Sequence, residues 1–321
     1  SKSTILRMHS VIDMNLFDLH CDTATRLYSE KQGFYKNNFH ISIESAGYLT
    51  KYAQVMAVWT DKRLSDSEGY KRFFTVLDNL NNEVSINSDK VCIAHTASQL
   101  AKIEASGKIP LILAVEDARI LENDISRIAV LHQKGVRIIT LNWYGDTCIG
   151  GAHDTSNGLT DFGKEGVKAS FALGIIPDIS HSSFKGAAET IELAYSAKKP
   201  IIASHSNSYS VNPHSRNLLD EHFLSIINLG GLVGINLCPE HLDLSANVNV
   251  DTVMRHVEHY LALGGENAIS MGCDLDGTSL PSDICGIADI YKIANAMQRL
   301  NYSSELTDKI LFNNAYNFLL R

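Results

Sequence analysis

Short apolar runs recur along the whole chain, and segments with helical spacing separate them. Each run is apolar almost throughout, which is typical of parallel strands covered on both faces. We place eight strands at Leu16–His20, Ala53–Trp59, Leu111–Glu116, Arg137–Trp143, Ile175–His181, Ile201–His205, Leu232–Leu237 and Ile269–Asp274. Eight alternations of strand and helix predict an α/β fold of the (β/α)8 TIM-barrel type. A doubly wound sheet is the alternative, but it rarely needs eight such units.

The segments between these strands divide into helices and two longer insertions. The sequence predicts helices at Glu122–Lys134, Ser183–Lys198 and Asp251–Leu263, which end near Gly135, Pro200 and Gly264. The polar insertion 61–89 also reads as a helix. The insertion 144–166 holds six glycines directly after the fourth strand. We interpret it as a loop that covers the substrate, with a plain surface excursion as the alternative. No linker interrupts the chain, so we expect a single domain over residues 1–321.

Composition excludes several classes of function. The net charge of -8 and the scattered Lys and Arg residues argue against a nucleic-acid surface. No apolar stretch approaches the roughly 20 residues of a membrane span, and no signal peptide or lipid-anchor tail is visible. The six cysteines form no C-x-x-C pair, so we expect reduced thiols in a cytoplasmic protein, although their even number leaves room for disulfides. The chain begins at Ser1 without methionine, which leaves room for a removed leader.

Five of the predicted strands end on residues that can bind a metal. The runs are LFDLHCD (His20 and Asp22), LILAVE (Glu116), IIPDISH (His181), PIIASH (His205) and AISMGCD (Asp274). In such barrels functional residues gather at the C-terminal ends of the strands, so we expect these side chains to converge there. A mixed set of histidines and carboxylates suits Zn²⁺, with Mn²⁺ or Fe²⁺ as alternatives. Five ligands exceed what one tetrahedral zinc needs, so two ions bridged by Glu116 are the economical interpretation.

Side-chain alternation refines this set without completing it. His20 and Asp22 share one face of a strand, whereas Cys21 points the other way and is not a natural ligand. Glu116 has a simpler explanation as the salt-bridge partner of Arg119 or Arg137.

One carboxylate and one arginine complete the candidate site. A carboxylate that is not a ligand is the expected general acid/base beside a metal-bound water, but Asp274 and Asp276 share the same parity, so periodicity cannot choose between them. Arg216 can bind a substrate carboxylate in a bidentate manner, or simply pair with Asp220 or Glu221. His153, in the glycine-rich insertion, stays ambiguous.

These residues lie in motifs that resemble the membrane dipeptidase (renal dipeptidase) family of zinc peptidases, which are amidohydrolase-type TIM barrels. The motifs are FDLHCDT (17–23), AVED (114–117), DISHSS (178–183), ASHSNSYSVNPHSRN (203–217) and GCDLDG (272–277), in the family's order over roughly residues 15–320. The resemblance implies two zinc ions, with His20 and Asp22 on one, His181 and His205 on the other, and Glu116 between them. It also implies Asp274 as the acid/base, Arg216 as the holder of the dipeptide's C-terminal carboxylate, and a homodimer.

The fourth strand departs from the family pattern. Mammalian members carry a histidine at its end that contacts the region of the scissile carbonyl, whereas this chain reads ITLNWYGDT (139–147). Trp143 stands at or next to that position, as in many bacterial relatives. We expect Asn142, Trp143 or Tyr144 to shape the substrate pocket instead.

The resemblance predicts a zinc-dependent dipeptidase. A metal-bridging water, deprotonated to hydroxide, would attack the peptide carbonyl, Asp274 would pass its proton to the leaving amine, and Arg216 would restrict the enzyme to free dipeptides. Whether a C-terminal D-residue is accepted is open. The alternatives are another hydrolase of this barrel type (a lactonase, a deacetylase or a β-lactam-opening enzyme) and a non-catalytic metal-binding protein. A carbamate-bridged relative is disfavoured, because the fourth strand lacks a lysine.

Overall fold

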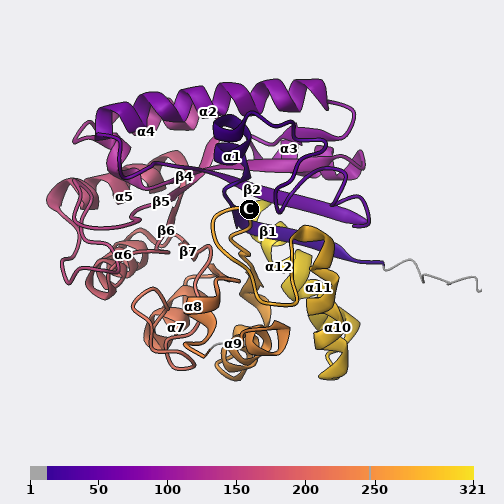
Figure 1. The fold of residues 1–321 in the computed structure, drawn as a ribbon. Helices are drawn as coiled ribbons and strands as arrows, with labels where there is room; N and C mark the ends of the chain where they lie inside the picture. The colour runs from indigo at the N-terminus through magenta and orange to yellow at the C-terminus, as the bar shows by residue number, and fades with distance from the viewer. Residues whose placement is uncertain (1–12, 246) are drawn as a thin grey trace, which may run out of the picture.

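The computed structural model describes residues 13–245 and 247–321, and its strands form a closed parallel barrel inside a ring of helices (Figure 1). The barrel strands are β1 (Asn15–Cys21), β2 (Lys51–Trp59), β4 (Ile109–Glu116), β5 (Val136–Thr140), β6 (Ile176–Asp178), β7 (Ile202–Ala203), β8 (Leu232–Ile235) and β9 (Ile269–Met271). Each pairs in parallel with the next, and β1 closes the ring by pairing with β9. The predicted TIM barrel is therefore confirmed.

A ninth strand, β3 (Val91–Ile93), was not predicted. It pairs with the first residues of β4, from Ile109 to Leu111. From Leu113 onward, the same edge of β4 pairs with β5 instead. It therefore lies beside the barrel at the end where the strands begin. Three residues are too few to show a period, which is why the sequence did not reveal it.

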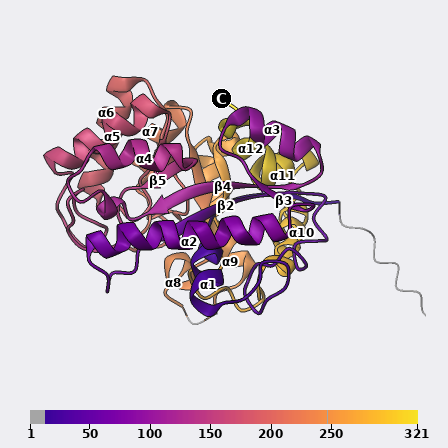
Figure 2. The ribbon, with the colours of Figure 1, turned by 90° about the horizontal axis from the view of Figure 1, so that it is seen from above.

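The helices cover the outside of the barrel and one of its ends (Figure 2). They are α1 (Thr23–Glu30), α2 (Asp66–Ile86), α3 (Ala97–Ala105), α4 (Ser126–Gln133), α5 (Asp161–Leu173), α6 (Phe184–Ala197), α7 (Asp220–Asn228), α8 (Pro239–Leu242), α9 (Val250–Ala262), α10 (Tyr291–Arg299), α11 (Ser304–Asp308) and α12 (Asn314–Leu319). Short 3-10 turns lie at Ala118–Leu121, Gly265–Asn267 and Ile287–Asp289, and a π turn lies at Lys309–Asn313.

The structure confirms three of the predicted helices closely and corrects one. The helices predicted at 183–198, 251–263 and within 61–89 correspond to α6, α9 and α2, and α2 begins with a capping box formed by Ser65 and Glu68. The helix predicted at 122–134 was too long, because α4 begins only at Ser126. Glu122 and Asn123 have φ of 48° and 56°, which no α-helix accommodates.

The barrel interior is filled from the end where the strands begin. Phe17, Val55, Ile112 and Ile138 belong to a buried cluster that also contains residues of α12, such as Phe318. Asn314 of α12 donates a hydrogen bond to the carbonyl of Ile269, the first residue of β9, at 2.8 Å. Figure 1 accordingly shows the C-terminus at the centre of the ring of strands. Helix α12 therefore plugs this end, which leaves the opposite end for a site.

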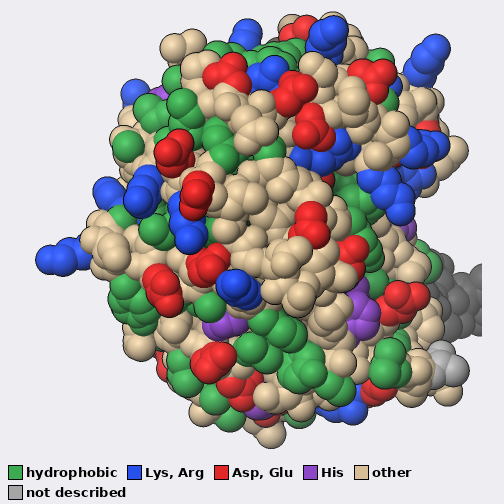
Figure 3. Space-filling model, turned by 90° about the vertical axis from the view of Figure 1, so that its left-hand side faces the viewer, with side chains coloured by type: hydrophobic (Ala, Val, Ile, Leu, Met, Phe, Trp, Pro, Cys, Tyr) green, Lys and Arg blue, Asp and Glu red, His purple; other side chains and the backbone are tan. Residues whose placement is uncertain are grey.

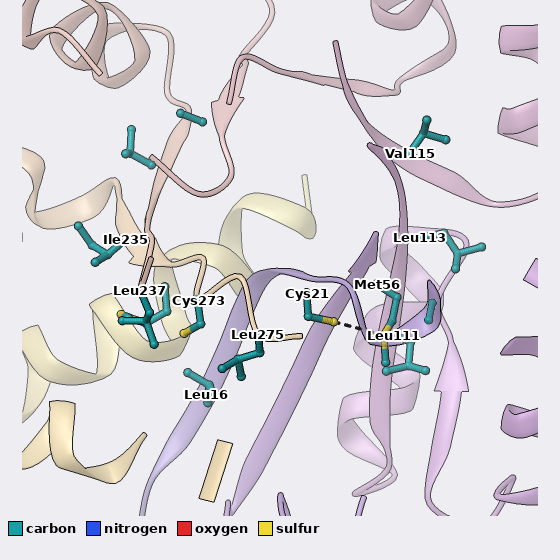
Figure 4. Packing of buried hydrophobic residues seen from close by; sticks show 14 of the residues in the cluster. Leu16, Cys21, Met56, Leu111, Leu113, Val115, Ile235, Leu237, Cys273 and Leu275 are labelled. Carbon is teal, nitrogen blue, oxygen red and sulfur yellow. Dashed lines mark hydrogen bonds between the residues drawn. The ribbon is translucent and has the colours of Figure 1, made fainter. Parts of the chain in front are cut away.

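A second apolar layer lies between the strands and the surrounding helices. Cys21 belongs to it: its Sγ lies 3.4 Å from Met56 Sδ, and both side chains pack near Leu111 and Leu113 (Figure 4). This confirms that Cys21 points away from His20. All six cysteines are free thiols, as expected. Within the described residues no helix is both long and apolar enough to span a bilayer.

Charged side chains of both signs are interspersed on the face of the molecule that carries α5 and α6 (Figure 3). The expected absence of a signal peptide concerns residues 1–12, which lie outside the described residues, as does residue 246 of the expected 1–321 domain.

Two glycines make room for the backbone of β7 and its loop. A Cβ on Gly272 would lie 1.8 Å from the carbonyl oxygen of Ser204, and a Cβ on Gly234 would lie 1.9 Å from the same atom. We therefore expect Gly272→Ala to lower the free energy of unfolding by at least about 2 kcal/mol, measured by urea denaturation.

Gly166→Ala is the matched control. Gly166 lies inside α5, and its added Cβ would meet Ile128 at 3.9 Å, an ordinary van der Waals contact. The helix gains from the substitution, so we expect an increase of about 0.5–1 kcal/mol. Equal losses in the two variants would contradict the steric explanation.

Candidate active site

The end of the barrel opposite α12 brings together three of the predicted metal ligands. His20 is the penultimate residue of β1, Asp22 caps the start of α1, and Glu116 ends β4. Nε2 of His20 lies 2.6 Å from Glu116 Oε2 and 3.4 Å from Asp22 Oδ2. All three residues are buried. Glu116 pairs with neither Arg119 nor Arg137: Arg119 binds Asp66 and Asp117, and Arg137 lies near the other end of the barrel, where it contacts Leu319 of α12.

His181 and His205 complete the group, although they do not lie in strands. β6 ends at Asp178 and β7 at Ala203, so the strands predicted up to the two histidines were too long. His181 has φ of 69°, which a strand does not allow, and the loop directs its ring toward His205. The two Nε2 atoms lie 3.1 Å apart, and Glu116 Oε2 lies 3.8 Å from Nε2 of His205.

A buried hydrogen-bond chain fixes the tautomer of His205. The hydroxyl of Ser204 donates to Asp178 Oδ2 at 2.5 Å, so its oxygen accepts from Nδ1–H of His205 at 2.7 Å. Asp178 also accepts from the hydroxyl of Thr140 at 2.6 Å. Since Nδ1 carries the proton, Nε2 of His205 presents a lone pair to the centre of the site, as a histidine that binds a metal through Nε2 must do.

The protonation states of the histidines follow from burial and from their neighbours. Burial lowers the pKa values of His181 and His205 well below the usual range, and the charge of Arg216 adds to the effect. Burial also opposes a charge on His20, but the carboxylates of Glu116 and Asp22 outweigh it and raise the pKa of His20 well above its usual value. The two neutral histidines therefore face a region of concentrated negative charge.

Asp274 and Asp276 occupy different environments, which separates two residues that periodicity could not. β9 ends at Met271, and both aspartates lie in the following loop with φ of 59° and 67°, so strand parity does not apply to them. Asp274 Oδ1 lies 3.7 Å from His20 Nε2. The carboxylate of Asp276 accepts hydrogen bonds from Thr23 and Arg26 and from the backbone of His40. Both aspartates line the cavity, but Asp274 lies beside His20, whereas Asp276 holds the surrounding loops together.

Arg216 lies beneath His205 and is buried. Its Nη2 donates to the carbonyl of His205 at 2.8 Å, and its Nη1 donates to the hydroxyl of Ser206 at 3.1 Å. It pairs with neither Asp220 nor Glu221, which contact His259 and His222. Its buried Nε has no hydrogen-bond partner among the described residues.

The three residues proposed from the fourth predicted strand have different surroundings. Trp143 lines the cavity of the site and packs against the ring of Trp59 at 4.9 Å. Asn142 is fully buried and binds the carbonyl of Gly150 and the hydroxyl of Ser182, so it ties two loops together and does not reach the cavity. Tyr144 is 44% exposed and does not line the cavity either. β5 stops at Thr140, so all three side chains are directed by a loop.

A cavity of about 280 Å³ opens over the carboxylates and His181. Its size is close to the lower limit for ligand pockets and suits a small substrate. Its wall includes Arg26 and Trp59, which were not predicted. Trp59 ends β2, so its position at a strand end was the available signal. Gly277 also lines the cavity, where a Cβ would lie 2.1 Å from Asp22 Oδ2 and 2.3 Å from Asp274 Oδ1.

The glycine-rich insertion comes close to the site but is not all loop. The segment predicted at 144–166 becomes helical at Asp161, where α5 begins, and its loop part ends at the cap residue Thr160. The backbone N–H of His153 donates to the carbonyl of His181 at 2.7 Å, and Nδ1 of His153 lies 3.0 Å from Ser215 Oγ. The insertion therefore packs against the loop that carries His181.

The donor set fits metal ions. Three groups of three residues each have their ligand atoms within 4.8 Å of one another: His20 with Asp22 and Glu116, Glu116 with His181 and His205, and His20 with His205 and Asp274. Among the described residues, Oδ1 of Asp22 is buried without a hydrogen-bond partner, and the neighbour of the buried Oε2 of Glu116 is Nε2 of His20, at 2.6 Å. Buried carboxylates without partners are costly, and a bound cation removes that cost.

Comparison with known sequences identifies relatives of the whole chain. The profile of the family described as membrane dipeptidase (peptidase family M19) matches residues 7–319. A protein from the pqqA 5′ region of Klebsiella pneumoniae is 29% identical over 246 residues, which cover 70% of this chain and 90% of that protein. Dipeptidase tcpJ of Claviceps purpurea is 29% identical over 255 residues, 77% of this chain and 59% of that longer protein.

Solved structures share the fold. The dipeptidase AC, a metallopeptidase of family M19, superposes with a TM-score of 0.89 at 24% identity. The match covers 96% of this chain and 98% of that protein. A metallopeptidase from Rhodobacter sphaeroides, bound to a phosphinate mimic of the dipeptide L-Ala-D-Ala, superposes with a TM-score of 0.89 at 23% identity. The match covers 96% of this chain and 99% of that protein. With the family profile matching nearly its whole length, this chain belongs to the membrane dipeptidase family, peptidase family M19, whose members are metallopeptidases that hydrolyse dipeptides.

Proposed function

We propose that this chain is a zinc-dependent dipeptidase that hydrolyses free dipeptides, including those with a C-terminal D-residue. The observation that carries the proposal is the set of three donor triads, two of which share Glu116. The extension to D-residues draws on the Rhodobacter sphaeroides neighbour, whose ligand mimics L-Ala-D-Ala. The homodimer expected from the family stays a prediction.

The donors divide between two zinc ions. His20 and Asp22 would hold one ion, His181 and His205 the other, and Glu116 would bridge them. The division is supported by the 2.6 Å approach of Glu116 to His20 and its 3.8 Å approach to His205. Histidine nitrogens and carboxylate oxygens are ligands that zinc accepts together. Zinc bound there would act as a Lewis acid that activates a water molecule and polarises the peptide carbonyl.

Asp274 would carry the proton from the water to the leaving amine. Burial raises the pKa of its carboxyl well above the usual range, and Asp22 and Glu116 add to the effect. A carboxyl with a raised pKa is suited to act as a general acid/base. The loop geometry keeps Asp274 at the wall of the cavity.

Arg216 would bind the C-terminal carboxylate of the dipeptide. It does not line the cavity, but its buried guanidinium has no carboxylate partner within 4.0 Å in the part of the chain that the structure describes. A substrate carboxylate would neutralise this charge, and longer peptides would lack that group at the required distance. Trp59 and Trp143 would provide an apolar wall for a substrate side chain.

We expect about two zinc ions per chain in the purified enzyme, measured by elemental analysis, because the five donors are too many for one tetrahedral ion. A chelator should abolish hydrolysis of L-Ala-L-Ala and L-Ala-D-Ala, and added zinc should restore it. Chelation should also lower the melting temperature, since the carboxylates then repel one another without a cation. Full turnover in the metal-free protein would disprove the zinc mechanism.

Asp274→Asn should retain its metal and lose about 10²–10⁴-fold in kcat, the usual contribution of a general acid/base. The matched control is Asp276→Asn, which changes a neighbouring aspartate in the same loop. Its loss should appear mainly in the free energy of unfolding, because Asp276 accepts hydrogen bonds from Thr23, Arg26 and the backbone of His40. Equal losses of kcat in the two variants, with metal retained, would contradict the role of Asp274.

Arg216→Met should lower kcat/KM for a free dipeptide by about 10²-fold or more, because truncating one partner of a buried charge pair costs on the order of 2–5 kcal/mol. The corresponding dipeptide amide lacks the carboxylate, so the wild-type enzyme and the variant should hydrolyse it at similar low rates. A loss of the same size on both substrates would assign Arg216 to the support of His205 instead. Circular dichroism and melting temperature monitor folding.

A further inference from the structure

A second cavity, of about 220 Å³, lies at the plugged end of the barrel, away from the proposed active site. Its wall combines three cationic residues, Arg137, Lys199 and Arg321, with apolar residues that include Phe171, Ile175 and Phe318. These residues come from β5, α5 and its C-terminal loop, the α6–β7 connection and the C-terminal segment around α12. Phe171, Ile175 and Phe318 are at least nine-tenths buried.

Arg137 is the residue of this cavity that most needs a partner. It is the second residue of β5, and its Nη2 donates to the carbonyl of Leu319 at 3.0 Å. Its Nη1 is buried and has no hydrogen-bond partner among the described residues. Burial lowers the pKa of Arg137, and no carboxylate counteracts the effect. Because arginine stays protonated in proteins, the charge requires an anion rather than the loss of a proton.

The other two cations of the cavity add positive charge without balancing it. Among the residues that the structure describes, no Asp or Glu side chain lies within 4.0 Å of Lys199 or Arg321, and none lines the cavity. Arg321 donates to the carbonyl of Gly230 at 3.3 Å. The C-terminal ends of α5 and α6 reach the cavity and favour nearby cations, but each provides only about half a negative charge. An anion therefore gains from all three cations at once.

We propose that this cavity binds a small organic anion. Its carboxylate or phosphate group would pair with Arg137 and Lys199, and its apolar body would pack against Phe171, Ile175 and Phe318. Free amino acids and dipeptides do not meet this description, because their ammonium group would lie among the cations. The site is therefore distinct from the substrate site in both position and ligand chemistry. It does not depend on the proposed dipeptidase activity.

Isothermal titration with four probes tests the proposal. Benzoate and phenyl phosphate carry both the charge and the apolar body, whereas benzamide lacks the charge and inorganic phosphate lacks the body. All titrations are repeated with the Arg216→Met variant, so that Arg216 cannot provide the binding. We expect saturable binding of benzoate or phenyl phosphate, at least about tenfold tighter than benzamide, because a hydrogen bond to a charged group contributes on this scale. The preferred anion distinguishes a carboxylate site from a phosphate site.

Two adjacent lysines provide a matched pair of variants. Lys199→Gln should weaken binding of the anion about tenfold, whereas Lys198→Gln, which removes the same charge one residue away and outside the cavity, should leave it unchanged. Dipeptide hydrolysis should be unaffected in both variants. Arg137→Met should abolish binding without lowering the melting temperature, because it removes an uncompensated charge. The proposal is wrong if neither anion binds, if benzamide binds equally well, or if the two lysine variants behave alike.

Discussion

The concentration of negative charge at one end of the barrel is the constraint on which the site depends. Asp22, Glu116 and Asp274 crowd around His20, and the Nε2 atoms of two neutral histidines, His181 and His205, lie 3.1 Å apart beside them. Without a cation, these carboxylates either repel one another or take up protons, as the raised pKa values of Glu116 and Asp274 indicate. Bound metal would turn the repulsion into attraction, so the affinity for metal and the stability of this end are coupled.

The rest of the fold keeps this arrangement rigid. At the far end α12 fills the barrel, and Gly234 and Gly272 allow the backbone at Ser204 to pass close to them. Ser204 in turn connects Asp178 to His205 and holds the tautomer that a metal needs. The close packing of Gly234 and Gly272 against the carbonyl of Ser204 therefore also supports the orientation of His205 in the site. The same plug creates the cationic cavity, because α12 brings Phe318 toward Arg137.

Much of the fold and of the site could be predicted, because both depend on local patterns. Apolar runs identified every barrel strand, and ligand-type residues at their ends identified the residues that converge. The errors at the strand ends share one cause. Strand periodicity was extended into loops, so His181 and Asp274 were placed on strands although their positive φ excludes it. Asn142 and Tyr144 were expected to shape the pocket for another reason, the absence of the family's histidine from the fourth strand. In the structure Asn142 is buried, Tyr144 is exposed, and neither lines the cavity.

By itself, the sequence determined the barrel, the order of the ligand-type residues along it, and the exclusion of Cys21, because strand spacing and side-chain alternation are properties of the local chain. The local pattern did not separate Asp274 from Asp276, and the family resemblance alone favoured Asp274 as the acid/base. Only the tertiary structure showed which of the two lies beside His20 and which supports the loops. Asp274 and Asp276 have the same local pattern, and their roles differ because residues far away in the chain reach them. His20 lies near Asp274, whereas Thr23, Arg26 and the backbone N–H of His40 donate hydrogen bonds to the carboxylate of Asp276.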